Sequence, residues 1–279
     1  MRTWSFTKGH GTQNDFVVLL DRDGTLEVGP AEVRFLCDRH AGIGGDGLLR
    51  AVPARYVPEW HGDGSAWFMD YRNADGSVAE MCGNGVRVFA RFLLEHGLVD
   101  GPVIPVATRG GLKEATVLAD GRVRVAMGPV AVAPPGDTVT VTTADGRRWA
   151  GLPADVGNPH GVAFVDDLAA LDLHAPPQFP ADLFPDGVNV EFVRVLGPRH
   201  IAMRVHERGV GETRSCGTGT VAAAAATRVH TGDTAPLPVT YRVEVPGGEV
   251  EVELAEDQAH LTGPAVLIAS GQVLVPEEG

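Results

Sequence analysis

The sequence is poor in several residue types, and each scarcity excludes a class of protein. It has three cysteines and two lysines among 279 residues, and aromatic residues make up 6% of the chain. Three cysteines without a Cys-x-x-Cys pair exclude a disulfide framework and a structural zinc site. Neither Lys8 nor Lys113 lies in a sequence context that suggests a Schiff base. We therefore expect a protein that works without a metal and without a cofactor.

Long apolar runs and an excess of positive charge are also missing. No run approaches the roughly 18 residues of a membrane span. The N-terminus lacks a charged segment followed by a continuous apolar core, so we expect no secretion signal and place the protein in the cytoplasm. The net charge of −13 argues against nucleic-acid or anionic-membrane partners, which require a basic surface. The composition, 44% hydrophobic and 21% charged, is that of an ordinary globular protein.

An internal repeat is the most informative feature that is present. Residues 78–86 contain Cys82 in the sequence Cys-Gly-Asn-Gly, and residues 212–220 contain Cys216 in the sequence Cys-Gly-Thr-Gly. The two cysteines are 134 residues apart, and each precedes an apolar, helix-like segment. Asn73 and Glu207 each lie nine residues before their cysteine, at the end of a predicted strand. The repeat predicts two similar halves that each contribute one thiol to a shared site.

The pattern along the chain predicts an α/β protein with short elements. Hydrophobic periodicity indicates a buried strand over residues 16–20 and helices over 31–39, 83–96 and 217–230. Residues 166–186, which contain several prolines, fit either a helix or a loop. We place one half at residues 1–130 and the other at 131–263, with the strand-like tail of 264–279 returning to the first half. Cys37 lies on the apolar face of its predicted helix and is expected to be core.

The cysteine turns suggest a specific chemistry. A helix N-terminus carries unsatisfied N–H groups and a positive dipole end, and glycines allow a ligand to approach the backbone. The N–H groups of Gly83 and Asn84, and those of Gly217 and Thr218, are therefore candidates for binding a carboxylate. The same field is expected to lower the pKa of each cysteine toward neutrality. Donors that bind the carboxylate would also stabilise the carbanion formed when an α-proton leaves.

Two thiols facing one carbon from opposite sides, one as thiolate and one as thiol, can remove a proton from one face and return one to the other. This reading makes the chain a cofactor-free amino-acid racemase or epimerase. A single cysteine before a glycine turn is usually a buried small hydrophobe, but two in matched frames favour acid–base catalysis. Several other polar residues have a structural interpretation when taken singly: Asn14, Asn158 and Asn189 as turn or strand-end residues, and Glu207-Arg208 as a surface pair.

Taken together, the motifs closely resemble the diaminopimelate epimerase family over essentially the whole chain. The similar segments are residues 11–16, 37–44, 73–77, 81–87, 157–160, 207–213, 216–219 and 261–265. The resemblance implies an α/β fold of two pseudo-symmetric domains, each a curled mixed sheet around a central helix, with the active site in the cleft between them. It implies interconversion of LL- and meso-diaminopimelate, which serves lysine and peptidoglycan synthesis, and it implies a homodimer.

The resemblance also assigns roles to individual residues. Cys82 and Cys216 become the acid–base pair. His160 and Glu207 are expected to orient or polarise the reacting centre. The substrate-binding set comprises Asn14, Asn73, Gly83, Asn84, Asn158, Asn189, Glu207, Arg208, Gly217 and Thr218.

The sequence departs from the family at two places. Gly47 lies where some relatives carry a glutamine that contacts substrate, and the segment after Cys216 reads Gly-Thr-Gly-Thr-Val-Ala instead of Gly-Thr-Gly-Ala-Cys-Ala. Two alternatives remain open. The first is a two-cysteine racemase acting on proline, hydroxyproline, histidine or another amino acid. The more remote one is a thiol redox or metal-binding protein that uses Cys82 and Cys216.

Overall fold

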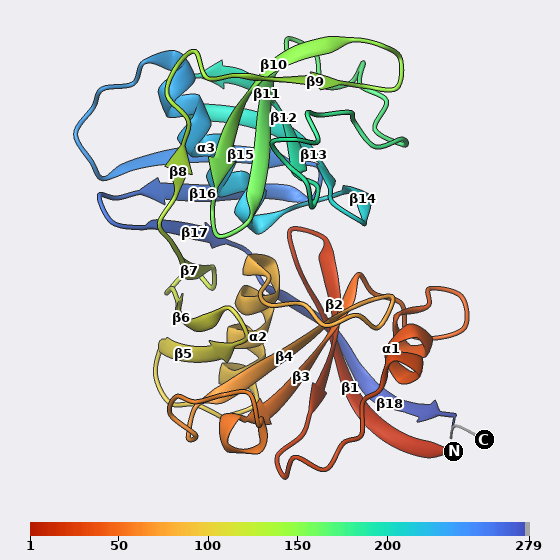
Figure 1. The fold of residues 1–279 in the computed structure, drawn as a ribbon. Coiled ribbons are helices and arrows are strands. Elements are labelled where there is room, and N and C mark those ends of the chain that lie inside the picture. Colours follow the sequence, from red (N-terminus) through yellow and green to blue (C-terminus); the bar gives the residue numbers. More distant parts are fainter. Residues whose placement is uncertain (277–279) are drawn as a thin grey trace. The chain divides into compact units, whose positions relative to one another are not determined.

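The computed structural model describes residues 1–276 and divides into two compact units. Unit 1 comprises Met1–Val125 and the C-terminal segment from Gly263, and unit 2 comprises Ala126–Thr262. Among the described residues, none of the helices has the length and apolar character needed to cross a membrane. Each unit is built from one long helix and a sheet of mixed strand directions (Figure 1).

Unit 1 is a sheet in which the strands pair in the order β18–β1–β2–β3–β4–β5–β6–β7. The β2–β3 and β4–β5 pairs are parallel and the others antiparallel. Its elements are β1 (Arg2–Gly11), β2 (Asn14–Leu20), α1 (Pro30–Cys37), β3 (Gly47–Pro53), the short 3₁₀ turn η1 (Ala54–Tyr56), β4 (Trp67–Asn73), α2 (Gly83–Glu95), β5 (Val103–Thr108), β6 (Gly111–Val117), β7 (Val123–Gly128, which extends past the unit's boundary) and β18 (Val266–Val275).

Unit 2 repeats this arrangement in the order β10–β11–β12–β13–β15–β16–β17. Here β11–β12 and β13–β15 are the parallel pairs. Its elements are β8 (Ala131–Val132), β9 (Val139–Thr142), β10 (Arg148–Asp155), β11 (Pro159–Phe164), β12 (Asn189–Gly197), β13 (His200–Glu207), β14 (Gly211–Thr213), α3 (Gly217–Thr231), β15 (Val239–Val245), β16 (Gly248–Leu254) and β17 (Ala259–Gly263). The succession of parallel and antiparallel pairs is identical to that of β1 to β7, so the predicted α/β fold of two pseudo-symmetric halves is confirmed.

In each unit the sheet curls around its helix. Helix α2 contacts β18 and every strand from β1 to β6, and α3 contacts strands along its own sheet from β8 to β16. The alanine run of α3, residues 222–226, is buried on all sides, as expected for a helix surrounded by other elements. Both helices begin at a cysteine N-cap, and α3 ends at Gly232, whose φ of 64° is the left-handed conformation that stops a helix. The predicted helices 83–96 and 217–230 are confirmed within one residue.

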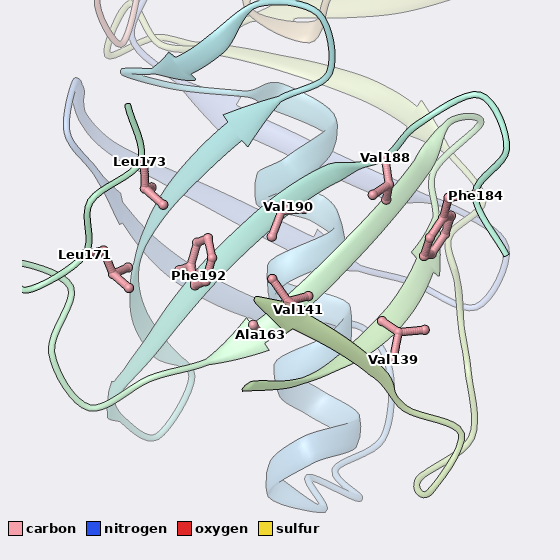
Figure 2. Packing of buried hydrophobic residues seen from close by; sticks show 9 residues of the cluster. All are labelled: Val139, Val141, Ala163, Leu171, Leu173, Phe184, Val188, Val190 and Phe192. Atoms are coloured by element: carbon pink, nitrogen blue, oxygen red, sulfur yellow. The ribbon is translucent and has the colours of Figure 1, made fainter. Parts of the chain in front are cut away.

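The outer face of the unit 2 sheet is covered by the segment between β11 and β12. Figure 2 shows Leu171 and Leu173 of this segment beside Phe192 of β12, and Phe184 at the other end of the same apolar cluster near Val188, with α3 behind the strands. The alternation of β12 therefore places Val190 and Phe192 outward and leaves the intervening residue facing the helix. The segment itself contains no helix, which decides between the two interpretations of residues 166–186.

Other sequence expectations can be compared directly with the structure. The tail strand β18 pairs antiparallel with β1, as expected for a return to the first half (Figure 1). Helix α1 ends at Cys37, two residues before the predicted end, because Asp38 is extended. Cys37 lies in an apolar cluster with Val33 and Leu36, and burial raises the pKa of its thiol to about 12, so its predicted packing role is confirmed.

Candidate active site

The thiol of unit 1 is held at the start of α2. Cys82 is the N-cap residue, and its Sγ accepts a hydrogen bond from the Gly85 N–H at 3.4 Å. Gly83 and Asn84 form the first turn of the helix, where backbone N–H groups have no intrahelical acceptor. The structure therefore provides at Cys82 the helix-start geometry that can bind a carboxylate.

Asn14 lies against this thiol. Its Oδ1 accepts from Cys82 Sγ at 3.6 Å and from Asn84 Nδ2 at 3.2 Å, and its Nδ2 donates to Asp46 Oδ2 at 2.8 Å. Because Asp46 accepts from the amide nitrogen, it fixes which end of the Asn14 amide faces the cysteine. Three of the unit 1 residues predicted from the sequence, Asn14, Cys82 and Asn84, thus form one hydrogen-bonded group.

A buried arginine fixes the turn that carries Asn14. Arg87 has no exposed surface and donates to Asn84 Oδ1 at 2.5 Å and to Thr12 Oγ1 at 3.0 Å. Thr12 and Gln13 both have positive φ, 49° and 61°, in the tight turn between β1 and β2. Burial lowers the pKa of Arg87 to about 10, which leaves the guanidinium positive at neutral pH.

Asn73 and Gly47 lie at the neighbouring strand ends of unit 1. Asn73 ends β4, as predicted, and its Nδ2 donates to Ser77 Oγ at 3.0 Å within the following turn. Gly47 pairs with Asn73 in the sheet. A Cβ at Gly47 would lie 2.7 Å from both the Arg72 carbonyl oxygen and Cε2 of Tyr71, so the Tyr71 ring fills the space that a side chain would need.

The thiol of unit 2 is held in the same way at the start of α3. Cys216 is the N-cap residue, its Sγ accepts from the Gly219 N–H at 3.4 Å, and Thr218 Oγ1 lies 3.6 Å from the sulfur. Gly217 and Thr218 form the first helical turn. The repeat seen in the sequence therefore corresponds to the same local structure, a cysteine cap on the helix at the centre of each sheet.

Two carboxylates, Glu207 and Glu191, act on this second thiol. Glu207 ends β13, as predicted, and accepts a hydrogen bond from Thr213 Oγ1. Burial raises the pKa of Glu207, although hydrogen bonds from Thr213 and Cys216 oppose the change. Burial, together with the negative charges of Glu207 and Glu191, holds the pKa of Cys216 well above its usual range. The expectation that the helix start lowers the cysteine pKa is therefore wrong for Cys216, because desolvation of the thiolate outweighs the helix field.

His160 and Asn158 form a buried group with a residue that sequence analysis did not single out. His160 Nδ1 lies 2.7 Å from Glu191 Oε1, and both side chains are fully buried. His160 Nε2 lies 3.0 Å from Asn158 Oδ1. Glu191 also lies beneath the first turn of α3, since a Cβ at Gly219 would be 2.6 Å from its Oε1.

Asn189 and Arg208 complete the predicted set in unit 2. Asn189 Oδ1 accepts from the backbone N–H of Arg208 at 2.9 Å, and Arg208 Nη1 donates to the Asp186 carbonyl at 3.0 Å. The aliphatic part of Arg208 packs on Gly187, where a Cβ would lie 2.9 Å from Cδ of Arg208. Asn189 thus fixes the backbone at the end of β13, next to Glu207.

The site residues that sequence analysis did not identify are those that fix the predicted side chains in position. Asp46 and Glu191 are 32 and 31 residues from the side chains they bind, so no local pattern links them. Arg87 binds Asn84 one helical turn away, but its second partner, Thr12, is 75 residues distant. A charged residue inside an otherwise apolar strand or helix was the available signal for Glu191 and Arg87. Within residues 1–276, no group of three or more His, Cys, Asp or Glu side chains has an arrangement that could hold a metal ion.

Comparison with known proteins identifies the family. The sequence profile of the diaminopimelate epimerase family matches residues 6–133 and 153–268. The diaminopimelate epimerase of Streptomyces coelicolor is 54% identical over 276 residues, which cover 96% of this chain and 94% of that protein. The diaminopimelate epimerase of Corynebacterium glutamicum is 49% identical over 284 residues, covering 98% of this chain and 99% of the relative.

A solved structure supports the fold. The crystal structure of a probable proline racemase from Agrobacterium radiobacter has a TM-score of 0.71 and 19% identity, covering 98% of this chain and 93% of the racemase. At that identity the likeness concerns the fold alone. The profile match and the close relatives together cover nearly the whole chain, and the chain therefore belongs to the diaminopimelate epimerase family, a family of isomerases.

Proposed function

We propose that this protein epimerises LL-2,6-diaminopimelate to meso-diaminopimelate without a cofactor, by proton transfer between the substrate α-carbon and two cysteines. Cys82 and Cys216 exchange the roles of thiolate base and thiol acid in the two directions. The reaction supplies a precursor of lysine and of peptidoglycan. The observation that carries the proposal is the duplicated helix start, in which each of two cysteines caps a helix and is followed by first-turn N–H donors.

The helix starts suit the reaction for an electrostatic reason. Loss of the α-proton places negative charge on the substrate carboxylate as well as on carbon. First-turn N–H groups at Gly83-Asn84 and Gly217-Thr218 would bind that carboxylate and gain strength as charge accumulates on it. Donors of this kind are already oriented, so they need no rearrangement during proton transfer.

The remaining polar residues are proposed to bind the substrate and to orient the reacting centre. Asn14, Asn73, Asn158, Asn189 and Arg208 would bind its charged groups, because amides and one guanidinium can pair with both an ammonium and a carboxylate. Glu207 and His160 would lie near the reacting centre. A site that hydrogen-bonds a distal amino-acid head should reject shorter amino acids, whose binding leaves buried polar groups unpaired.

The decisive experiment is proton NMR of LL-diaminopimelate with the reduced protein in D₂O and no added cofactor. Loss of an α-proton signal with growth of the meso isomer supports the reaction and the substrate together. If the α-proton persists while the protein is folded and both thiols titrate as free, the proposal is overturned. Proline, trans-4-hydroxyproline and histidine, measured in the same way, separate a two-cysteine racemase of another amino acid from the proposed enzyme.

Three further proposals accompany this function: a homodimer, a cytoplasmic location, and the absence of nucleic-acid or membrane partners. The acidic net charge of −13 supports the last of these. Sedimentation of the purified protein over a range of concentrations tests the homodimer, and a single monomeric species would contradict it.

A further inference from the structure

The register of the two sheets shows which residues occupy equivalent positions in the two units. In the parallel pair β2–β3, Phe16 lies opposite Gly47 and Val18 opposite Leu49. In β11–β12, His160 lies opposite Asn189 and Val162 opposite Glu191. Phe16 and His160 are therefore equivalent, and so are Leu49 and Glu191.

Contacts beneath the two helices give the same correspondence independently. A Cβ at Gly85 of α2 would lie 3.5 Å from Cδ2 of Leu49. A Cβ at Gly219 of α3 would lie 2.6 Å from Oε1 of Glu191. Leu49 thus lies beneath Gly85 in unit 1, and Glu191 lies beneath Gly219 in unit 2. Each glycine is the third residue after its cysteine.

In unit 1 the apolar residues Phe16 and Leu49 are sufficient for the fold, because the same kind of sheet curls around the same kind of helix there. Unit 2 instead buries an imidazole and a carboxylate at zero exposure. Within the described residues, Oε2 of Glu191 has no hydrogen-bond partner. A buried ionisable pair with an unsatisfied oxygen is often less favourable for stability than well-packed apolar residues. The replacement of Phe and Leu by His and Glu therefore points to chemistry at Cys216.

We propose that Glu191 is a positioning residue that fixes the orientation and the Nδ1 hydrogen of His160 for the reaction at Cys216. The inference rests on the proposed function and extends it to a residue outside the predicted site. An ionised carboxylate only accepts hydrogen bonds, so Nδ1 of His160 must carry the hydrogen at the 2.7 Å contact with Glu191 Oε1. The second nitrogen, Nε2, faces Oδ1 of Asn158 at 3.0 Å, so both ring nitrogens are directed at oxygen acceptors.

This arrangement makes the two thiols chemically different. Cys216 has two ionisable neighbours, Glu191 on β12 and Glu207 on β13, and its sulfur contacts the Thr218 hydroxyl. His160 on β11 is linked to this group through Glu191, to which it is bonded, and through the charge of Glu207. The position equivalent to Glu207 in unit 1 is Asn73, which is bonded to Ser77. Within unit 2, Glu191 is therefore placed to act on Cys216 through His160 and Glu207.

A double-variant cycle tests this role. Glu191→Gln keeps the volume but removes the charge, and it allows a donor to face Nδ1, so kcat should fall roughly 10- to 100-fold, as when outer-shell partners of an imidazole are removed, with KM within about threefold. In a His160→Gln background, adding Glu191→Gln should change kcat less than about twofold, because the group that Glu191 positions is gone. The double variant His160→Phe/Glu191→Leu, which installs the pair of unit 1, should fold with a cooperative thermal transition and lack the activity.

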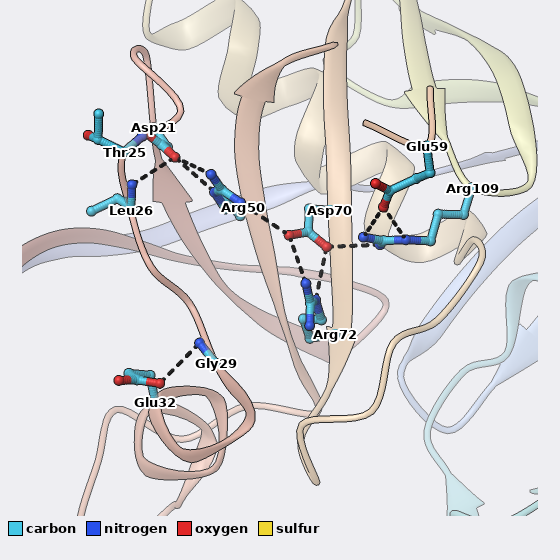
Figure 3. A network of polar contacts seen from close by, with 10 residues as sticks. All are labelled: Asp21, Thr25, Leu26, Gly29, Glu32, Arg50, Glu59, Asp70, Arg72 and Arg109. Carbon is cyan, nitrogen blue, oxygen red and sulfur yellow. Dashed lines mark hydrogen bonds and ion pairs between the residues drawn. The ribbon is translucent and has the colours of Figure 1, made fainter. Parts of the chain in front are cut away.

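Asp21→Asn is the matched control. Asp21 is a buried carboxylate of unit 1 that binds Arg50 in the network of Figure 3, so the same change there should leave kcat unaltered. Glu191→Gln with wild-type kcat would overturn the inference, and so would a Glu191→Gln effect of equal size in the His160→Gln background. An active wild type with either result leaves the proposed function intact. A wild type inactive on diaminopimelate overturns both.

Discussion

A matched pair of glycine substitutions tests the inequivalence of the two helix starts. Gly85 and Gly219 each follow their cysteine by three residues and donate to its sulfur. A methyl group at Gly85 would lie 3.4 Å from Cys82 Cβ and 3.5 Å from Leu49, which is ordinary van der Waals contact. The same methyl at Gly219 would lie 2.6 Å from Glu191 Oε1 and 3.2 Å from Cys216 Cβ.

The two substitutions should have opposite effects on stability. Replacing glycine by alanine within a helix gains roughly 0.5–1 kcal/mol from reduced backbone entropy. At Gly85 nothing opposes this gain. At Gly219 the methyl must displace a carboxylate that is fully buried and bonded to His160, and overpacking of this kind costs about 1–3 kcal/mol. We expect Gly85→Ala to be neutral or slightly stabilising, and Gly219→Ala to lose about 1–2 kcal/mol after the helical gain is subtracted.

Urea unfolding of the two variants and the wild type, followed by circular dichroism, measures the difference. The same samples give kcat for LL-diaminopimelate, which should fall in Gly219→Ala because Glu191 and Cys216 are both displaced. Equal free energies of unfolding and equal kcat for the two variants would refute the reasoning, since they would show that the carboxylate does not fill the space beneath α3.

Three other outcomes are expected. Cys82→Ser and Cys216→Ser should each lower the rate of α-proton exchange by roughly 10²–10⁴-fold, the usual contribution of a general acid or base. A variant that exchanges the α-proton at the wild-type rate in NMR would show that its cysteine takes no part in the mechanism. Glu207→Gln removes a negative charge that raises the pKa of Cys216, so this pKa should fall. Iodoacetamide should then modify Cys216 faster at pH 7, with Cys82 as internal control. Slower modification would contradict the expected direction of the pKa change. The pKa of Asp70 (Figure 3) is lowered because its arginine partners outweigh the effect of burial. Its contribution to the free energy of unfolding is therefore present above the unfolded-state pKa near 3.9 and is lost as the pH falls below that value. Asp70→Asn should therefore lose roughly 3–5 kcal/mol at pH 7, and its unfolding free energy should vary less than that of the wild type between pH 5 and pH 3.

The features predicted well from the sequence are those encoded locally. Cysteine and glycine at a helix start, and an alanine run with apolar neighbours, specify α2 and α3 within one residue. The repeat spacing also located the strand ends at Asn73 and Glu207. Strands β1 and β17 were missed, because the polar and glycine residues of β1 and the short length of β17 give no clear alternation. The division at residue 130 and the roles of the site residues stay predictions.

The pKa of Cys216 illustrates what local sequence cannot provide. The helix start is visible in the sequence and favours a thiolate. The desolvation that opposes it depends on how completely the surrounding strands enclose the sulfur, and Glu191 and Glu207 come from two of those strands. Burial and long-range charge are properties of the assembled sheet, so a motif alone gave the wrong sign.

The divergence of the two halves follows a pattern that the proposed reaction explains. In the proposed reaction each thiol acts as base in one direction and as acid in the other, which accounts for the same helix start in both units. The strand positions around them differ, with Phe16, Leu49 and Asn73 in unit 1 against His160, Glu191 and Glu207 in unit 2. LL- and meso-diaminopimelate are diastereomers and not mirror images, so the two proton transfers need not have equal barriers or equal surroundings. Residues that act on only one thiol can then change independently, whereas the caps that serve both directions cannot.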